Sequence, residues 1–213
     1  MKLCLFIVIE EKYSFIFGLP VKNRHLCVIF AFLQFLVALT SLLQHAYSIR
    51  KYNTIFACQS NITTSSSASE KFLAYDIIIF DYGLMHRVLG TDECIANYLD
   101  GGFMRSVWCL SHTSSLFLLI IALFFHTKPI WLLWPALLMQ SSYALGLAVL
   151  TMATAPKMLD ALSGMVDTEF GTAFTVYLIG FISNWLFTFV LWHHYWYIEE
   201  KLKAISTKHD STG

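Results

Sequence analysis

Charged residues are scarce in this chain. They make up 13% of its 213 residues, whereas hydrophobic residues make up 57%. A soluble domain normally carries about 25% charged residues, so a chain of this length cannot cover a globular surface with well-solvated groups. The formal net charge is zero, so neither nucleic acid nor an acidic surface is indicated as a partner. The composition indicates a membrane protein.

Charge is absent altogether from four apolar runs, each long enough to cross a bilayer. These runs cover residues 26–47, 107–125, 130–153 and 172–197. We predict an all-α integral membrane fold, a four-helix bundle over residues 26–198. Residues 1–25 form a cytosolic or interfacial segment, and residues 199–213 form a cytosolic tail.

A signal-peptide cleavage site is also lacking near the N-terminus. The apolar stretch Leu3 to Ile9 is similar to a short signal peptide, but Glu10, Glu11 and Lys12 follow it without a small-residue cleavage site. We therefore expect the segment to remain in the protein. Residues 3–19 are expected to lie at the membrane interface or to pack against the bundle.

The loop over residues 48–106 contains a less apolar stretch, Phe72 to Gly90. Asp76, Asp81 and Arg87 would each be costly at the centre of a bilayer. Apolar residues recur in this stretch at steps of three and four, which is typical of an amphipathic helix. We predict that it lies on the membrane surface.

Three features favour a lumenal position for this loop and cytosolic termini. Basic residues are biased toward the side of the two termini. Asn61 begins a glycosylation sequon, which matters only in a lumenal loop. Cys58 and Cys94 lie in the same loop, where an oxidising lumen permits a disulfide. We predict a glycan on Asn61 and a bridge between Cys58 and Cys94, with Cys109 as a competing partner.

Polar side chains at membrane depth are few: Gln34, Gln140 and Asn184 stand out. They are predicted to hydrogen-bond between helices, and the alternative is that they line a path for a polar solute. Ser142 and Gly146, or alternatively Ala144 and Ala148, form a stripe of small residues that permits close approach of a neighbouring helix.

Signatures of enzymes are lacking. The sequence has no glycine-rich phosphate loop, no HExxH motif and no nucleophile elbow, so we predict no catalytic site, metal or cofactor. A haem-bearing electron carrier is the sharpest alternative, because His112 and His126 lie about 21 Å apart along one helix. Most of the histidines lie at helix ends, however, where they serve as half-polar interface residues. His193 and His194 share such an end with an aromatic belt.

Two short patterns go beyond general membrane physics. One is Trp131-x3-Pro135-x4-Gln140, and the other is Trp192-x2-Tyr195-x-Tyr197-Ile198. Together with the lead-in Val21-Lys22-Asn23-Arg24, a short link between the second and third helices and Pro156 just after the third, the chain resembles the lysosome-associated four-transmembrane protein family. The resemblance extends from about Gly18 to Ile198.

This resemblance implies a non-enzymatic protein of late endosomes and lysosomes. Family members are linked to trafficking of other membrane proteins, lipid handling and movement of small solutes. They commonly recruit ubiquitin ligases through proline-tyrosine motifs in a longer tail, but residues 199–213 contain no proline. Ligase recruitment is therefore not carried over.

The sequence thus favours an adaptor or trafficking factor of the endosomal and lysosomal membrane, with the plasma membrane as the alternative location. Its expected partners are the lipid bilayer and other membrane proteins, and the oligomeric state stays open. A small-solute transporter or transporter subunit is the second hypothesis, and the haem-bearing carrier is the third.

Overall fold

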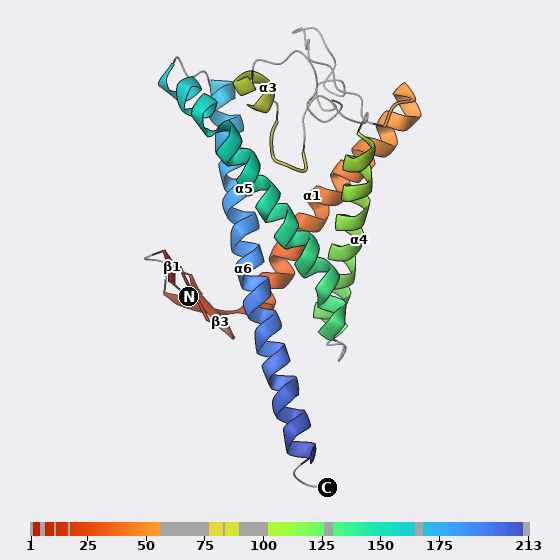
Figure 1. Ribbon diagram of the computed structural model, residues 1–213, viewed down its shortest axis with the longest axis vertical. Coiled ribbons are helices and arrows are strands. Elements are labelled where there is room, and N and C mark those ends of the chain that lie inside the picture. The colour runs from red at the N-terminus through yellow and green to blue at the C-terminus, as the bar shows by residue number, and fades with distance from the viewer. Residues whose placement is uncertain are drawn as a thin grey trace.

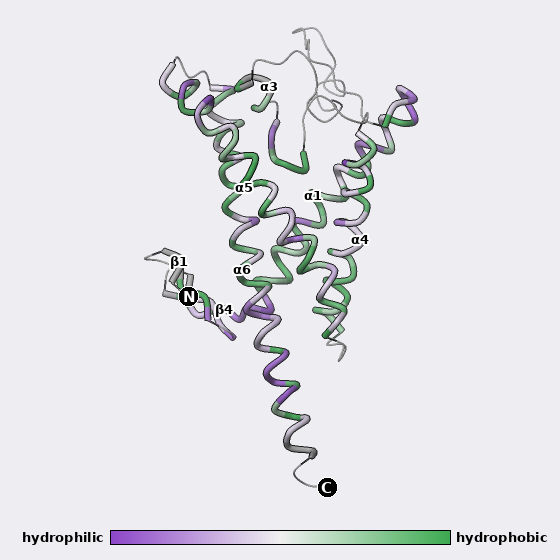
Figure 2. The backbone as a smooth tube through the Cα atoms, viewed as in Figure 1, coloured by the Kyte–Doolittle hydropathy of each residue, from purple (hydrophilic) through white to green (hydrophobic). Residues whose placement is uncertain are grey.

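Four helices of the computed structural model are long and apolar enough to cross a membrane. The helices are α1 (Asn23–Tyr52), α4 (Phe103–Phe125), α5 (Trp134–Ser163) and α6 (Thr168–Asp210), and the short η2 (Ile130–Leu133) leads into α5. The structure describes residues 2–4, 7–10, 12–16, 18–55, 77–82, 84–89, 102–125, 130–164 and 168–210. Apolar residues dominate the four helices where they pack together (Figure 2). The prediction of four apolar helices is confirmed.

The helices are paired and splayed (Figure 1). α1 packs against α4, and α5 packs against α6. The two pairs meet at one end of the bundle and diverge toward the other end, where the short helix α3 (Leu84–Leu89) lies. The bundle is therefore closed at one end and open at the other.

A large apolar cluster fills the closed end. Each of the four long helices contributes to it, and its fully buried members include Ala31, Leu119, Leu137 and Leu191. Arg24, at the start of α1, donates from Nε and Nη2 to the Leu123 carbonyl, at 3.1 and 2.7 Å. A cation at the C-terminal end of α4 satisfies a backbone acceptor that the helix itself leaves unpaired.

Local sequence explains other helix ends. α1 stops at Asn53, which has a left-handed backbone (φ 55°) and donates its N–H to the Ile49 carbonyl. α5 has Pro135 in its first turn, where no backbone donor is needed. Pro156 was expected just after this helix, but α5 continues through it to Ser163.

A small antiparallel sheet precedes the bundle, which the all-α prediction does not include. Its strands pair in chain order: β1 (Lys2–Cys4), β2 (Ile7–Ile9), β3 (Tyr13–Ile16) and β4 (Leu19–Lys22). Gly18 lies in the turn between β3 and β4 with φ 82°, a conformation that glycine adopts without strain. The sheet lies beside α6 near the closed end of the bundle (Figure 1).

Asn23 joins this sheet to α1. Its side chain accepts from Ser14 Oγ at 2.7 Å and donates to the Glu10 carbonyl at 2.6 Å. Ile9 is fully buried in the apolar cluster of the bundle. The sheet therefore packs against the bundle through Ile9, and this is one of the two positions expected for residues 3–19.

The stretch predicted as a surface amphipathic helix has a different structure. Residues 77–80 form a turn, and helix is confined to α3 within the described part of this stretch. The Asp81 carboxylate accepts from the Met85 N–H at 2.5 Å, so this acidic residue caps a new helix instead of continuing one. Ile77 and Ile78 are buried, and the segment descends between the two helix pairs (Figure 1).

Several predicted features fall on other parts of the chain. Cys58, Asn61, Cys94 and His126 lie outside the described residues. The glycan on Asn61 and the bridge between Cys58 and Cys94 stay predictions.

Candidate functional site: a buried polar layer

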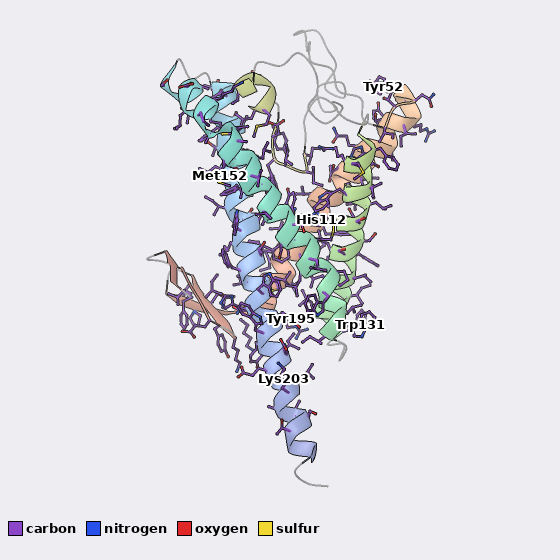
Figure 3. The ribbon with its side chains drawn as sticks, viewed as in Figure 1. Tyr52, His112, Trp131, Met152, Tyr195 and Lys203 are labelled. Carbon is purple, nitrogen blue, oxygen red and sulfur yellow. The ribbon has the colours of Figure 1, made fainter. Side chains whose placement is uncertain are left out.

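A layer of polar side chains crosses the middle of the bundle. Each helix contributes: Gln34 from α1, His112 from α4, Gln140 and Tyr143 from α5, and Asn184 from α6. All five are buried, and His112 and Gln140 are fully so. Figure 3 shows His112 near the centre, where the helix pairs cross. We call these five residues the polar layer.

Hydrogen bonds within the polar layer have a fixed direction. Asn184 Nδ2 donates to the Gly180 carbonyl at 2.8 Å, so its Oδ1 is the acceptor for Gln140 Nε2 at 2.9 Å. Gln140 Oε1 lies 3.3 Å from His112 Nε2 and accepts a hydrogen bond from its N–H. The network therefore assigns His112 to the neutral tautomer with hydrogen on Nε2.

Two atoms of the polar layer have no hydrogen-bond partner among the described residues. They are Gln34 Nε2, a donor, and His112 Nδ1, an acceptor in the assigned tautomer. Both side chains lie next to Tyr143: its ring centroid is 5.1 Å from that of His112, and its hydroxyl lies near Gln34 without making a hydrogen bond of normal geometry to Gln34 Nε2. Tyr143 also donates its hydroxyl to the Ile78 carbonyl, which ties the inserted turn to α5.

Only two of the three polar residues predicted from the sequence contact each other directly. Gln140 and Asn184 meet directly, as predicted for interhelical bonding, whereas Gln34 approaches them through Tyr143. Sequence reasoning missed His112 as the partner of Gln140, and it missed Tyr143. Tyr143 follows Gln140 by three residues, so helical spacing places the two on one face of α5.

Buried apolar side chains lie between the polar layer and the closed end of the bundle. Below Gln140 on α5 lies Leu137, and below Asn184 on α6 lie Phe187 and Leu191, all at most 1% exposed. They belong to the apolar cluster described above. In this structure the polar layer is followed by packed hydrocarbon on that side.

A second polar contact lies nearer the open end. Arg105 Nε, on α4, donates to His45 Nε2 on α1 at 3.3 Å. His45 Nδ1 lies 3.1 Å from the Ile55 carbonyl, to which it donates as the other tautomer. This contact joins α1 to α4 nearer the open end than the polar layer does.

The histidines considered for haem serve as hydrogen-bonding groups within the protein. His112 and His45 make the contacts given above, and His193 Nδ1 bonds the Phe189 carbonyl at 2.8 Å. Among the described residues, no three His, Cys, Asp or Glu side chains are grouped in a way that would hold a metal ion. The contacts of His112 and His45 join two helices, whereas that of His193 lies within α6.

Aromatic side chains gather at the closed end. Trp192 packs edge-on against Tyr195, with centroids 5.9 Å apart, and donates Nε1 to Ser141 Oγ at 3.0 Å. Trp134 of α5 packs on the same tyrosine at 5.8 Å. Tyr195 and Trp131 lie at similar heights in Figure 3. The two patterns quoted from the sequence thus converge here, in the position expected of an interfacial belt.

Comparison with known proteins gives one match. A family of unknown function, DUF8774, matches residues 6–203. The chain belongs to this family. No curated protein and no solved structure matches it. The matched range includes β2, β3 and β4, the helices α1, α4 and α5, and α6 as far as residue 203.

Proposed function

We propose that this member of DUF8774 is a non-enzymatic adaptor in endosomal and lysosomal membranes, which binds other membrane proteins and assists their trafficking. The proposed location and role rest on the sequence resemblance to lysosome-associated four-transmembrane proteins. The proposed mode of binding rests on a feature of α6, namely its length and its apolar seam.

The length of α6 carries the proposal. The helix has 43 residues, about 64 Å at 1.5 Å per residue. The hydrocarbon core of a bilayer is roughly 30 Å thick. The C-terminal part of α6, residues 198–210, includes many hydrophilic residues and contains Lys203. This end of the helix extends beyond the other helices (Figure 1), is coloured largely as hydrophilic (Figure 2) and has Lys203 along it (Figure 3). We call this part the α6 extension.

An apolar seam continues from the bundle along the α6 extension. Tyr195, Ile198, Leu202 and Ile205 follow one another at steps of three, four and three, so they share one face of the helix. Tyr195 is 7% exposed inside the bundle, whereas Ile205 is 58% exposed. An amphipathic helix of this kind docks its apolar face into a groove on a partner.

Charged side chains on the flank of the α6 extension form an ion pair with each other. Glu199 and Lys203 form an ion pair at 2.7 Å along the helix. Such an exposed pair adds little to helix stability, because water and salt screen the two charges. It nevertheless keeps charge away from the seam, so a partner meets an apolar stripe with a charged border.

In the proposed orientation the α6 extension lies in the cytosol and the open end of the bundle faces the lumen. The bias of basic residues toward the termini supports this orientation. A glycan on Asn61 and a bridge between Cys58 and Cys94 are expected in the same orientation.

A small-solute transporter is the second candidate, favoured by the unpartnered Gln34 Nε2 and His112 Nδ1 in the polar layer. A permeating polar solute would use such groups. The packed leucines below Gln140 oppose this hypothesis, because a solute would have to cross hydrocarbon on that side. Saturable flux by the purified protein alone in liposomes would favour transport over the adaptor function.

The proposal predicts that the seam is required to retain a membrane partner. In cells treated with a cross-linker, changing both Leu202→Ser and Ile205→Ser should lower recovery of specific membrane proteins with the tagged chain about tenfold. Loss of buried anchor side chains typically has an effect of that size. Lys203→Ser, outside the seam on the charged flank, is the matched control and should leave recovery unchanged. Equal recovery with all three proteins would contradict the proposal.

A further inference from the structure

One face of the N-terminal sheet starts in the bundle and continues beyond it. Directly paired residues of antiparallel strands lie on the same face, so the pairings of Ile9 with Ser14 and of Ser14 with Val21 place these three residues together. Ile9 is fully buried in the apolar cluster of the bundle, and Val21 packs against that cluster. Leu19 lies two residues before Val21 on β4, and residues two apart on a strand share a face. This face therefore extends from the bundle as far as Leu19.

Leu19 lies where this face leaves the bundle. It is 69% exposed, whereas Ile9 and Ser14 at the other end of the strands are at most 1% exposed. A single exposed leucine is ordinary on a protein surface in water. On this sheet, however, the leucine continues an apolar face that begins among membrane-spanning helices, and its neighbours Gly18 and Pro20 carry no polar side chain.

Charged side chains lie at the opposite end of the strands. Glu10 follows β2, Lys12 precedes β3 and Lys22 ends β4, and all three are exposed. Lys22 pairs with Tyr13, directly after Lys12, at the end of the sheet where α1 begins. Figure 2 shows hydrophilic residues where β4 leads into α1. The sheet is therefore charged at the end next to α1 and apolar at the end that carries Leu19.

The direction of the sheet matches this change in polarity. Its charged end lies next to α6 at about the level of Tyr195 (Figure 3), and its other end extends away from α6 and toward the open end of the bundle (Figure 1). Tyr195 belongs to the aromatic belt, and such belts lie at the boundary between water and hydrocarbon. The sheet thus runs from that boundary toward the hydrocarbon region.

The outer edge of the sheet also suits a lipid environment. β4 is an edge strand, and Pro20 within it has no backbone N–H. A backbone donor without a partner is costly in hydrocarbon, so an edge strand with one donor fewer loses less on contact with lipid. The interfacial layer still contains water, which can pair the remaining backbone groups of a sheet at shallow depth.

We propose that the N-terminal sheet is a membrane anchor, which docks on the lipid leaflet at the closed end of the bundle. Ile9 holds the sheet to the helices, Leu19 enters the acyl-chain region, and Lys12 and Lys22 stay among headgroups and water. The ligand is the bilayer surface itself, recognised by its hydrocarbon and not by a particular headgroup. This contact goes beyond the proposed adaptor function and requires no partner protein. The same segment then occupies both positions expected from the sequence, the interface and the bundle.

Quenching by brominated lipid tests this proposal on the full-length protein. An environment-sensitive fluorescent amino acid replaces Leu19, and the protein is reconstituted into phosphatidylcholine liposomes with plain or brominated acyl chains. Its emission should be quenched as strongly as from position Leu33, a 54% exposed residue of the membrane-spanning helix α1. The same replacement of Lys22, on the same strand, is the matched control and should lose little emission. No quenching at position 19, or equal quenching at positions 19 and 22, would overturn the proposal.

Substitution of Leu19 tests the anchor independently of a fluorophore. In plain liposomes, hydrogen exchange of β3 and β4 should accelerate in Leu19→Asp and stay slow in Leu19→Met. A carboxylate is costly among acyl chains, whereas a surface position in water tolerates either side chain with little effect. Equal exchange in the two variants would place Leu19 in water and would overturn the proposal.

Discussion

Replacing Gln140 with leucine should lower the free energy of unfolding by about 2 kcal/mol. Gln140 is fully buried and joins three helices, because it donates to Asn184 and accepts from His112. Leucine at this position would leave the side-chain oxygen Oδ1 of Asn184 and the Nε2–H of His112 without hydrogen-bond partners. Each unpaired buried group costs about 1–3 kcal/mol, which exceeds the average of about 0.6 kcal/mol for one interhelical bond in a membrane. Thermal unfolding of the purified variant in detergent measures the change.

Gly146→Leu is the matched control for this prediction. Sequence reasoning alone predicts the opposite order, with Gly146→Leu the more damaging change because it would push a neighbouring helix away. In the structure, a side chain on Gly146 points into open space. Gln140→Leu should therefore lower the unfolding temperature clearly more than Gly146→Leu does. The reverse order would show that α5 packs through its small residues and not through the polar layer.

Gly180→Leu should be the most damaging single change in the bundle. A β-carbon on Gly180 would overlap the ring of Phe80 and lie 2.9 Å from the Phe80 Cβ. Phe80 has little freedom to withdraw, because its own backbone is left-handed (φ 57°) within a turn that Tyr143 holds. Overpacking of this kind typically costs about 1–3 kcal/mol. The leucine atoms beyond the β-carbon should in addition push the turn out from between the helices.

Release of the turn is measurable separately from stability. Hydrogen exchange of residues 77–82 in the detergent-solubilised protein should accelerate in Gly180→Leu, because the Ile78 and Phe80 contacts with α5 and α6 are lost. The same residues should keep their slow exchange in Gly146→Leu. Unchanged exchange in Gly180→Leu would contradict the observed packing of Phe80 on α6.

The sequence was sufficient to predict the four spanning helices, because an uncharged apolar run of about 20 residues has few other stable structures. It also identified Gln140 and Asn184 as interhelical bonding groups, since polar side chains at that depth need partners. The composition and length of each apolar run are enough to predict the spanning helices and the polar residues within them. These predictions do not require knowledge of contacts between distant segments.

The remaining features depend on contacts between segments far apart in the chain. The apolar spacing over Phe72 to Gly90 predicted one surface helix, but the Asp81 carboxylate caps the short helix α3 and the Tyr143 hydroxyl holds Ile78 in a turn before it. The partner of Gln140 is His112, on another helix, and no local spacing connects the two. The face that Gly146 presents is likewise set by the splay of the helix pairs.

The central claim is that the apolar seam of the α6 extension contacts another membrane protein. Site-specific photo-cross-linking tests it most directly, with a photoreactive amino acid placed at Ile205 in the seam or at Lys203 on the charged face of the full-length chain in cells. The account predicts a discrete adduct with another membrane protein from position 205 and none from position 203. The same adducts from both positions, no adduct from position 205, or an adduct only with a second copy of the chain would contradict it.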